Sequence, residues 1–319
     1  MPSYDLVSLE LLLNIAESGT LTGGAGRSLM GASAASQRIG KLEAALEQPL
    51  LERLPRGVRL TEAGEVLAGR ARIIRRELRS ATGELEAIRA LERGEVRLGS
   101  FPTMSASILS DALKEAHARW PGIGVLVTSA LRPTLLDMLQ AGEIEIALLW
   151  SYPWTEEAEK SLDLRPIMDD ETLLLVDADS PLTDGVSLAA VVSHPWITRG
   201  SEHPASDVLS RSTATLGVTP DVVYRANDYL EVQAMVAAGV GIAMAPRIAL
   251  DHHRPDVKAI RFRTEDRIPS RTIYLATIGR RAYTPAMRAV AEAVADAAAR
   301  RSEPRGEAAP AGSARQNFL

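Results

Sequence analysis

The chain has 319 residues, with 46% hydrophobic and 24% charged side chains, a composition typical of a soluble globular protein of two or three domains. It contains no cysteine, which excludes disulfides, thiolate metal sites and cysteine nucleophiles. No apolar run approaches the ~20 residues of a membrane span, and the acidic N-terminus lacks the basic start of a secretion signal, so we expect a cytoplasmic protein without a membrane partner.

The net charge of −5 is unevenly distributed. Residues 27–79 carry eleven basic and six acidic side chains, a local charge of +5, and the other residues therefore sum to −10. A compact basic segment on an acidic body is typical of a nucleic-acid-binding head. A solvated helical surface gives the same charge, so the charge alone leaves both interpretations open.

Three short helices are predicted in the first fifty residues. Apolar residues at helical spacing predict a helix over 5–18. A second helix, capped by Thr20 or Thr22, extends to about residue 29 and is weak by propensity because three glycines fall in it. A third helix spans about 32–47.

The third helix has two unlike faces. One face is an apolar stripe that repeats at intervals of four, three and four residues, formed by Ala35, Ile39, Leu42 and Leu46. The opposite face carries Ser33, Gln37 and Lys41, with Ser36 and Arg38 on its flanks. Serine and glutamine side chains can hydrogen-bond base edges in a major groove, so this acid-free face is the candidate base reader.

A basic hairpin follows the third helix. Pro55 and Gly57 predict a tight turn between two short extended segments, and Arg53, Arg56 and Arg59 surround it. Three helices and a basic hairpin predict a winged helix-turn-helix over residues 1–60, whose arginines would contact phosphates. A generic helical subdomain with a polar surface fits the same pattern.

A long helix is predicted over 61–91, with Thr61 as its N-cap. Its apolar seam alternates steps of four and three residues through Leu67, Ala71, Ile74, Leu78, Ala81, Leu85 and Ile88. Three heptads are near the minimum for a coiled coil. We favour dimerisation with a second copy, and the alternative is packing against the body of the same chain.

Strands and helices alternate from residue 92 to 301, which predicts an α/β fold with largely parallel sheets. The length suits a two-lobed domain, with lobe I over about 92–164 and 270–301 and lobe II over about 165–269. We expect the chain to cross between the lobes near 164–167 and 263–271. The segment 302–319 has no apolar period and predicts a disordered tail.

The sequence lacks the motifs of common enzymes. Its five histidines show no metal-ligand spacing, and no phosphate-binding loop, dinucleotide fingerprint or nucleophile elbow is present. We therefore expect neither an enzyme nor a bound metal or cofactor.

Several stretches resemble LysR-type transcriptional regulators. The resemblance is carried by "SQRIGKLEAALEQPLLER" and "RGVRLTEAG" near the N-terminus and by "EVRLGSF", "HPWIT" and "VAAGVGIAMAP" further along. It implies a winged helix-turn-helix, a dimerising linker helix and a two-lobed domain like that of periplasmic binding proteins. It also implies a homodimer or homotetramer that binds promoter DNA and a small effector, with RNA polymerase as a further partner.

The resemblance assigns DNA contacts residue by residue. The base-reading positions fall on Ala32, Ser33, Ser36, Gln37 and Lys41, and the phosphate contacts fall on Arg38, Arg53 and Arg56. The chain departs from the family pattern where Ser-Gln-Pro-Ala is common, because residues 31–34 read Gly-Ala-Ser-Ala. Gly24 also replaces a usual alanine. Fewer direct base contacts are then expected, and more of the specificity rests on Ser33, Gln37 and DNA shape.

Effector contacts are expected between the lobes, where strands end and helices begin. The candidates are Ser100, Thr103, Thr128, Thr198 and Asn227. Hydroxyls beside the exposed amides of a helix start suit an anionic metabolite, although each residue taken singly also fits a helix cap or a turn. Trp150, Tyr152 and Trp154 could line this site, form a lobe or subunit contact, or simply pack.

The sequence therefore predicts a sequence-specific transcriptional regulator whose binding to double-stranded promoter DNA responds to a small molecule. The alternative is a cytoplasmic small-molecule-sensing protein whose helical head serves only to oligomerise.

Overall fold

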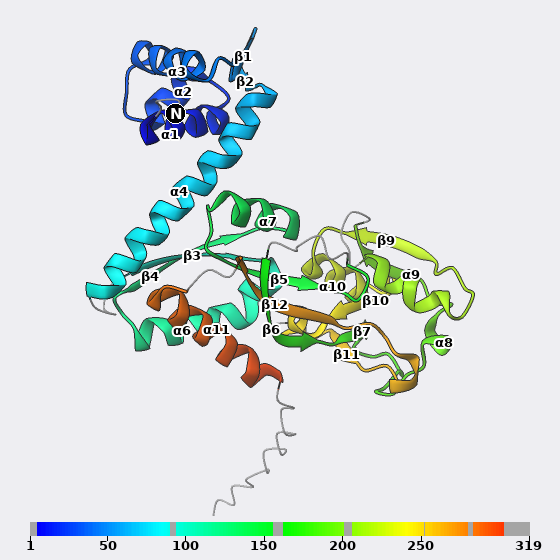
Figure 1. The fold of residues 1–319 in the computed structure, drawn as a ribbon. Coiled ribbons are helices and arrows are strands. Elements are labelled where there is room, and N and C mark those ends of the chain that lie inside the picture. The colour runs from blue at the N-terminus through cyan, green and yellow to red at the C-terminus, as the bar shows by residue number, and fades with distance from the viewer. Residues whose placement is uncertain are drawn as a thin grey trace, which may run out of the picture.

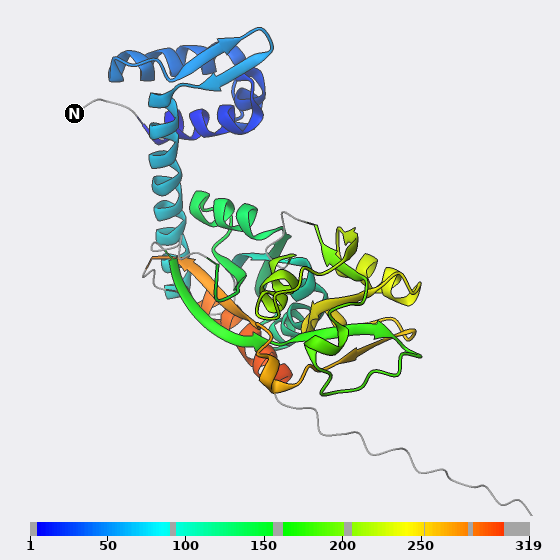
Figure 2. The ribbon, with the colours of Figure 1, turned by 90° about the vertical axis from the view of Figure 1, so that its right-hand side faces the viewer.

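Figures 1 and 2 show the computed structural model of the chain. It describes residues 5–89, 94–155, 162–200, 206–251, 253–279 and 283–302. In both views a small N-terminal head stands at one end of a long helix, and a larger two-lobed body lies at the other end. The predicted disordered tail, apart from Ser302, lies outside the described residues.

The head comprises residues 5–60. Its elements are α1 (Leu6–Ser18), α2 (Leu21–Arg27), α3 (Ala32–Leu46), β1 (Leu51–Leu54) and β2 (Gly57–Leu60). The Thr20 hydroxyl caps α2 by accepting a hydrogen bond from the Gly23 amide. Thr20 is one of the two caps that the sequence predicted. Leucines of α1 and the apolar stripe of α3 form one core with the first turns of the next helix. The three predicted helices and the hairpin are therefore present.

Gly57 fixes the wing, which is the antiparallel β1–β2 hairpin, against the head. Its φ of 102° lies in the left-handed region, and a Cβ there would come within 2.4 Å of the Gly19 carbonyl oxygen. The next amide, that of Val58, donates to the same oxygen at 2.9 Å. Only glycine allows this close backbone approach without strain.

The linker helix α4 (Glu62–Arg89) has 28 residues, a length of about 42 Å at ~1.5 Å per residue. The Thr61 hydroxyl caps it by accepting from the Gly64 amide at 3.0 Å. Beyond the head, α4 contacts α7 (Arg132–Ala141) of the body. The linker therefore sets the distance between head and body (Figure 1).

Lobe I is a five-stranded sheet in the order β4-β3-β5-β12-β6, with helices packed on it. Its elements are β3 (Gly94–Ser100), α5 (Pro102–Met104), the π-helical turn η1 (Ser105–Leu109), α6 (Ser110–Arg119), β4 (Ile123–Ser129), α7 (Arg132–Ala141), β5 (Ile146–Ser151), β6 (Leu162–Asp170), β12 (Arg271–Ile278) and α11 (Pro285–Ser302).

Lobe II is a second five-stranded sheet in the order β11-β7-β10-β8-β9, with an apolar core on each face. Its elements are β7 (Thr172–Asp177), α8 (Leu188–Val191), β8 (Trp196–Arg199), α9 (Ser206–Ala214), β9 (Val222–Ala226), α10 (Tyr229–Ala237), β10 (Ile242–Pro246), the 3₁₀ turn η2 (Arg247–Leu250), β11 (Val257–Ile260) and η3 (Thr264–Asp266).

The sheets are mixed, which corrects the expectation of largely parallel sheets. In lobe I, β3 pairs in parallel with β4 and β5, whereas β12 pairs antiparallel with both β5 and β6. The chain leaves lobe I through β6 and returns to it through β12. Because these two strands are neighbours in the sheet, they run in opposite directions. Lobe II likewise combines two parallel and two antiparallel pairings.

The strand β6 was not predicted. It is an edge strand that contains Pro166 and is largely exposed, so it lacks the alternation of apolar and polar residues that marks a half-buried strand. Because β6 continues to Asp170, the chain leaves lobe I at Glu171, a few residues later than the sequence suggested. The return falls just before Arg271, inside the predicted range.

We predict that Gly57→Ala lowers the free energy of unfolding of the head by about 1–3 kcal/mol, because an L-residue is strained at this φ and its Cβ meets a backbone oxygen. Gly26→Ala in α2 is the control, since a Cβ there meets nothing within 4 Å and alanine favours a helix by about 1 kcal/mol. Hydrogen exchange of head peptides in the full chain measures both. Equal protection of the two variants would contradict the prediction.

Candidate functional site

Helix α3 presents the predicted base-reading face to solvent. Its apolar side is anchored in the head by Ala35, Ile39 and Leu42, each at most 3% exposed. On the other side Ser33, Gln37 and Lys41 are exposed, as is Ala32, and Ser36 is half-buried. The helix therefore offers hydroxyl, amide and ammonium groups outward without an acid among them.

Arg38 is already engaged within the head. Its Nη1 lies 2.9 and 2.8 Å from the two carboxylate oxygens of Asp5, the residue that caps α1. Hydrogen bonds from Ser8, together with the guanidinium of Arg38, lower the pKa of Asp5. This ion pair ties the start of α1 to α3, and Arg38 would have to exchange Asp5 for a phosphate to contact DNA.

The wing carries free and paired arginines. Arg53 on β1 and Arg56 in the turn are exposed, and no acid among the described residues forms an ion pair with either. Arg59 on β2 instead pairs across the hairpin with Glu52, with an N–O distance of 2.5 Å. Two of the three wing arginines are thus available to an outside anion.

The predicted effector residues occupy strand ends on both lobes. Thr103 at the start of α5 and Thr128 at the end of β4 are half-buried, and Thr198 near the end of β8 is 8% exposed. The Thr103 hydroxyl accepts from Arg271 at 3.2 Å, and the Thr198 hydroxyl accepts from Arg225 at 3.5 Å. Both hydroxyls are therefore backed by guanidinium groups.

Ser100 and Asn227 are placed less favourably. Ser100 is fully buried, and its hydroxyl lies 3.4 Å from the Phe101 carbonyl oxygen. Asn227 is exposed, and its backbone amide donates to a carboxylate oxygen of Glu231 at 2.5 Å. Neither the Ser100 hydroxyl nor the Asn227 amide faces outward unpaired.

The lobes meet around a buried ion pair that the sequence did not reveal. Arg271 and Asp170 are register partners on β12 and β6, and their side chains are 2% and 0% exposed with an N–O distance of 2.8 Å. The other oxygen of Asp170 accepts from the Ile248 amide of lobe II at 3.1 Å. No sequence motif marks this pair, because the two residues lie a hundred positions apart.

Aromatic rings surround the Arg271 guanidinium. Its carbon lies 5.2 and 5.4 Å from the ring centres of Phe101 and Trp150, distances typical of cation–π contacts. Tyr152 and Tyr229 are also buried, and burial raises the pKa of both phenols. Uncharged aromatic rings therefore lie around the Arg271 guanidinium, whose charge is neutralised by Asp170.

The tryptophan and tyrosine cluster forms a lobe contact. Tyr152 stacks on Trp154 with ring centres 4.8 Å apart, and Arg211 of lobe II lies 4.7 Å above the Trp154 ring. Of the roles that the sequence left open, the structure supports the contact between lobes. Trp154, which is half-buried, thus contacts Tyr152 of lobe I and Arg211 of lobe II.

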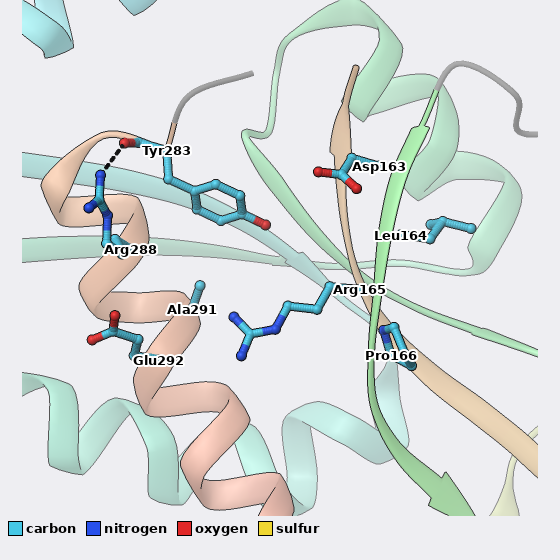
Figure 3. A pocket seen from close by; sticks show the side chains of 8 residues that line it. All are labelled: Asp163, Leu164, Arg165, Pro166, Tyr283, Arg288, Ala291 and Glu292. Carbon is cyan, nitrogen blue, oxygen red and sulfur yellow. Dashed lines mark hydrogen bonds between the residues drawn. The ribbon is translucent and has the colours of Figure 1, made fainter. Parts of the chain in front are cut away.

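A cavity of 750 Å³ lies on a different part of the body, between β6 and α11 (Figure 3). Arg165 extends into it, with Tyr283, Arg288 and Glu292 on the α11 side and Asp163 on the strand. None of the predicted effector residues lines this cavity. Its charged side chains are exposed and of both signs.

The described part of the chain offers neither a metal cluster nor a membrane span. In the described ranges, no group of three or more histidine, aspartate or glutamate side chains is arranged to hold a metal ion. Within the same parts of the chain, no helix combines the length and the apolar character needed to cross a bilayer.

A winged helix-turn-helix head, a long linker helix and a two-lobed α/β body define a class of protein: a DNA-binding transcriptional regulator with its own ligand-binding domain. Family models match both parts, "Bacterial regulatory helix-turn-helix protein, lysR family" over residues 6–65 and "LysR substrate binding domain" over residues 89–299. The chain belongs to the LysR family of transcriptional regulators.

Curated relatives and solved structures agree with this membership. The "DNA-binding transcriptional dual regulator OxyR" of Escherichia coli K12 is 27% identical over 69% of this chain and 71% of its own length. A full-length OxyR variant from Pseudomonas aeruginosa shares the fold with a TM-score of 0.73 at 21% identity, covering 93% and 95% of the chains. Full-length CbnR in complex with its target DNA gives 0.64 at 21%, covering 94% and 100%.

We predict that Arg271→Met destabilises the chain by about 3–5 kcal/mol, because it leaves the Asp170 carboxylate buried without a counter-charge. The double variant Arg271→Met with Asp170→Leu regains most of that loss, since both charges are then absent. Urea unfolding of the full chain measures the cycle. Additive losses in the double variant would show that the two side chains are not energetically coupled.

Proposed function

We propose that this protein is a cytoplasmic regulator that reads promoter DNA with the outward face of α3 and the arginines of the wing. The observation that carries the proposal is the two-sided character of α3, which is anchored by its apolar stripe while Ser33, Gln37 and Lys41 project outward. In this arrangement the side-chain amide and hydroxyl meet base edges, and Arg53 and Arg56 meet the flanking phosphates.

The Arg38–Asp5 pair gives the head a specific way to respond to DNA. In the free head Asp5 neutralises Arg38. A phosphate that approaches α3 competes for the same guanidinium, since both partners are oxyanions. Arg38 then completes the phosphate contacts that the resemblance assigns to it.

We further propose that α4 joins two copies of the chain. The first part of its predicted seam, including Leu67 and Ala71, packs into the head, whereas Ile74, Leu78 and Leu85 are 37%, 47% and 65% exposed. Leu6 and Leu9 of α1 continue this apolar strip along a shallow groove of 250 Å³. A second copy that brings its own α4 would cover leucines otherwise left in water.

Effector binding at the junction of the lobes would then act on DNA through assembly. Two dimers joined through their α/β bodies place four heads along a promoter. If an effector binds one arrangement of subunits better than another, it shifts the population toward that arrangement, and so changes the spacing of the heads. RNA polymerase is a further partner at such a promoter.

The peroxide response named for several relatives is not part of the proposal. Curated relatives include the "Probable hydrogen peroxide-inducible genes activator" of Streptomyces viridosporus, 28% identical over 77% of this chain. This sequence has no cysteine, and thiol oxidation by peroxide needs a cysteine thiolate. The effector is therefore sought among molecules that bind reversibly.

We predict that two variants separate base reading from phosphate contact. Gln37→Ala weakens the preference for the cognate site by about 1–3 kcal/mol, whereas Arg56→Ala weakens binding to all sequences and lowers the salt slope by about 0.9. Binding of the upstream DNA at several salt concentrations measures both. Arg254→Ala in lobe II, where Arg254 is exposed and paired with Asp256, serves as the control. Absence of any DNA binding at low salt would favour the oligomerisation-only alternative.

We predict that Leu78→Asp splits the dimer, because it places a charge in the exposed seam. Val66→Asp is the matched control, since Val66 is 64% exposed on the same helix but lies about 120° around it from Leu78 at ~100° per residue. Sedimentation of the full-length variants measures the mass in solution. An unchanged mass for Leu78→Asp would show that the seam does not join copies.

A further inference from the structure

The short segment between the reading helix and the wing is held from both sides. It comprises Pro49, Leu50 and Leu51, which follow α3 and lead into β1. The Leu50 side chain is 1% exposed and belongs to the core of the head. Contacts to the backbone of this segment therefore decide how the wing is placed relative to α3. The inference drawn from these contacts rests on the proposed function, in which α3 and the wing contact DNA together.

Glu43 of α3 holds this segment from one side. One carboxylate oxygen, Oε1, accepts from the Leu50 amide at 2.7 Å and from the Leu51 amide at 3.1 Å. Hydrogen bonds from backbone amides to an ionised carboxylate are stronger than those between neutral groups. The Glu43 side chain is half-buried and lies about 120° around α3 from Gln37 at ~100° per residue. It therefore holds the segment without facing the reading side of the helix.

Thr61, the cap of α4, holds the same segment from the other side. Its hydroxyl donates to the Pro49 carbonyl oxygen at 2.6 Å and accepts from the Gly64 amide at 3.0 Å. Its own amide donates to the Leu50 carbonyl oxygen at 3.0 Å. A Cβ at Gly64 would overlap that carbonyl oxygen, so the first turn of α4 lies directly against the segment.

The segment thus joins the two groups of side chains that recognition requires. Gln37 lies on the same helix as Glu43, while Arg53 and Arg56 follow the segment on the wing. Base edges and phosphates have a fixed relative position on duplex DNA, and phosphate contacts set the register in which base contacts are made. The two groups can therefore engage together only if the wing keeps its position relative to α3.

We propose that Glu43 is a positioning residue for DNA recognition, which holds the wing where its arginines meet phosphates while α3 meets base edges. Glu43 acts through the amides of Leu50 and Leu51 and does not itself touch DNA. Thr61 fixes the same segment to the linker helix. Glu43 was not among the residues that the sequence suggested, because its partners are backbone amides, which no side-chain motif marks.

Three substitutions in the full-length protein separate the reach of Glu43 from its charge. Both hydrogen bonds end on one oxygen, so Glu43→Gln can keep them with its amide oxygen, which has two lone pairs. Glu43→Asp keeps the charge on a shorter side chain, and Glu43→Met keeps the length without an oxygen. We expect Glu43→Gln to bind the upstream DNA with an unchanged salt slope. Glu43→Asp and Glu43→Met are expected to lower the slope by at least about 0.9, the contribution of one phosphate contact.

Combination with Arg56→Ala measures the coupling between Glu43 and the wing. Arg56→Ala is expected to lower the salt slope by about 0.9 in the unsubstituted background and by less than half of that in Glu43→Met, where the wing has already lost its phosphate. A purely structural role would make the two losses additive. Glu43→Asp, the milder change, carries the cycle if Glu43→Met fails to fold. Glu47→Met is the matched control with an unchanged slope, since Glu47 is exposed at the end of α3 and its carboxylate pairs with no described residue.

The role of Glu43 is overturned if Glu43→Asp and Glu43→Met both keep the unsubstituted salt slope, or if Glu43→Gln loses as much slope as Glu43→Asp. It is also overturned if Arg56→Ala has the same effect in every background. Each of these outcomes, obtained with unsubstituted protein that binds DNA, refutes this inference alone. Unsubstituted protein that does not bind DNA at low salt refutes the proposed function, and this inference with it.

Discussion

Asp170 and Arg271 form the ion pair on which the arrangement of the body depends. The pair lies where the chain leaves lobe I and where it returns, and it is almost fully buried. Breaking one partner would leave an uncompensated charge in an apolar setting, which costs several kcal/mol. The same two side chains reach the Ile248 amide in lobe II and the Thr103 hydroxyl in lobe I. The pair therefore holds the two crossing strands together. It also orients the Thr103 hydroxyl, which belongs to one of the predicted effector residues.

The head depends on a different constraint, which is that α3 must bury one side and leave the other bare. The buried stripe holds the helix in a small core, and the wing is held by the close backbone approach at Gly57. Neither feature touches DNA in the proposed function, but both decide where Gln37 and Arg56 lie. A rigid head with an acid-free face can then contact base edges and phosphates at the same time.

The linker helix connects these two systems mechanically. Arg75 on α4 lies 3.4 and 3.5 Å from the carboxylates of Glu10 and Glu17 on α1, and its side chain is only 12% exposed. Glu17 in turn pairs with Arg27 at the end of α2. This chain of charges makes the head and the start of α4 one unit, so a change in the angle between two bodies would be transmitted to the reading helices.

Features that depend on neighbours along the chain could largely be predicted from the sequence. The stripe of α3, the caps at Thr20 and Thr61, the turn at Gly57 and the α/β alternation are local patterns, because 3.6-residue and two-residue periods record which side of an element is buried. The resemblance to the LysR family, carried by contiguous motifs, was likewise readable and is confirmed by the family models. The edge strand β6 was not predicted, since its exposed and buried residues do not alternate and so leave no two-residue period in the sequence.

Contacts between residues far apart in the chain could not be predicted from local patterns. Nothing near Asp170 or Arg271 in the sequence announces a partner a hundred residues away, and Arg199 ends β8 like any strand-end residue until Tyr229 is seen beside it. Of the five predicted effector residues, the fold sets Thr103 and Thr198 in front of arginines and buries Ser100. These outcomes follow from the pairing of β6 with β12 and the approach of two lobes, which are long-range choices made by the packing of the whole chain.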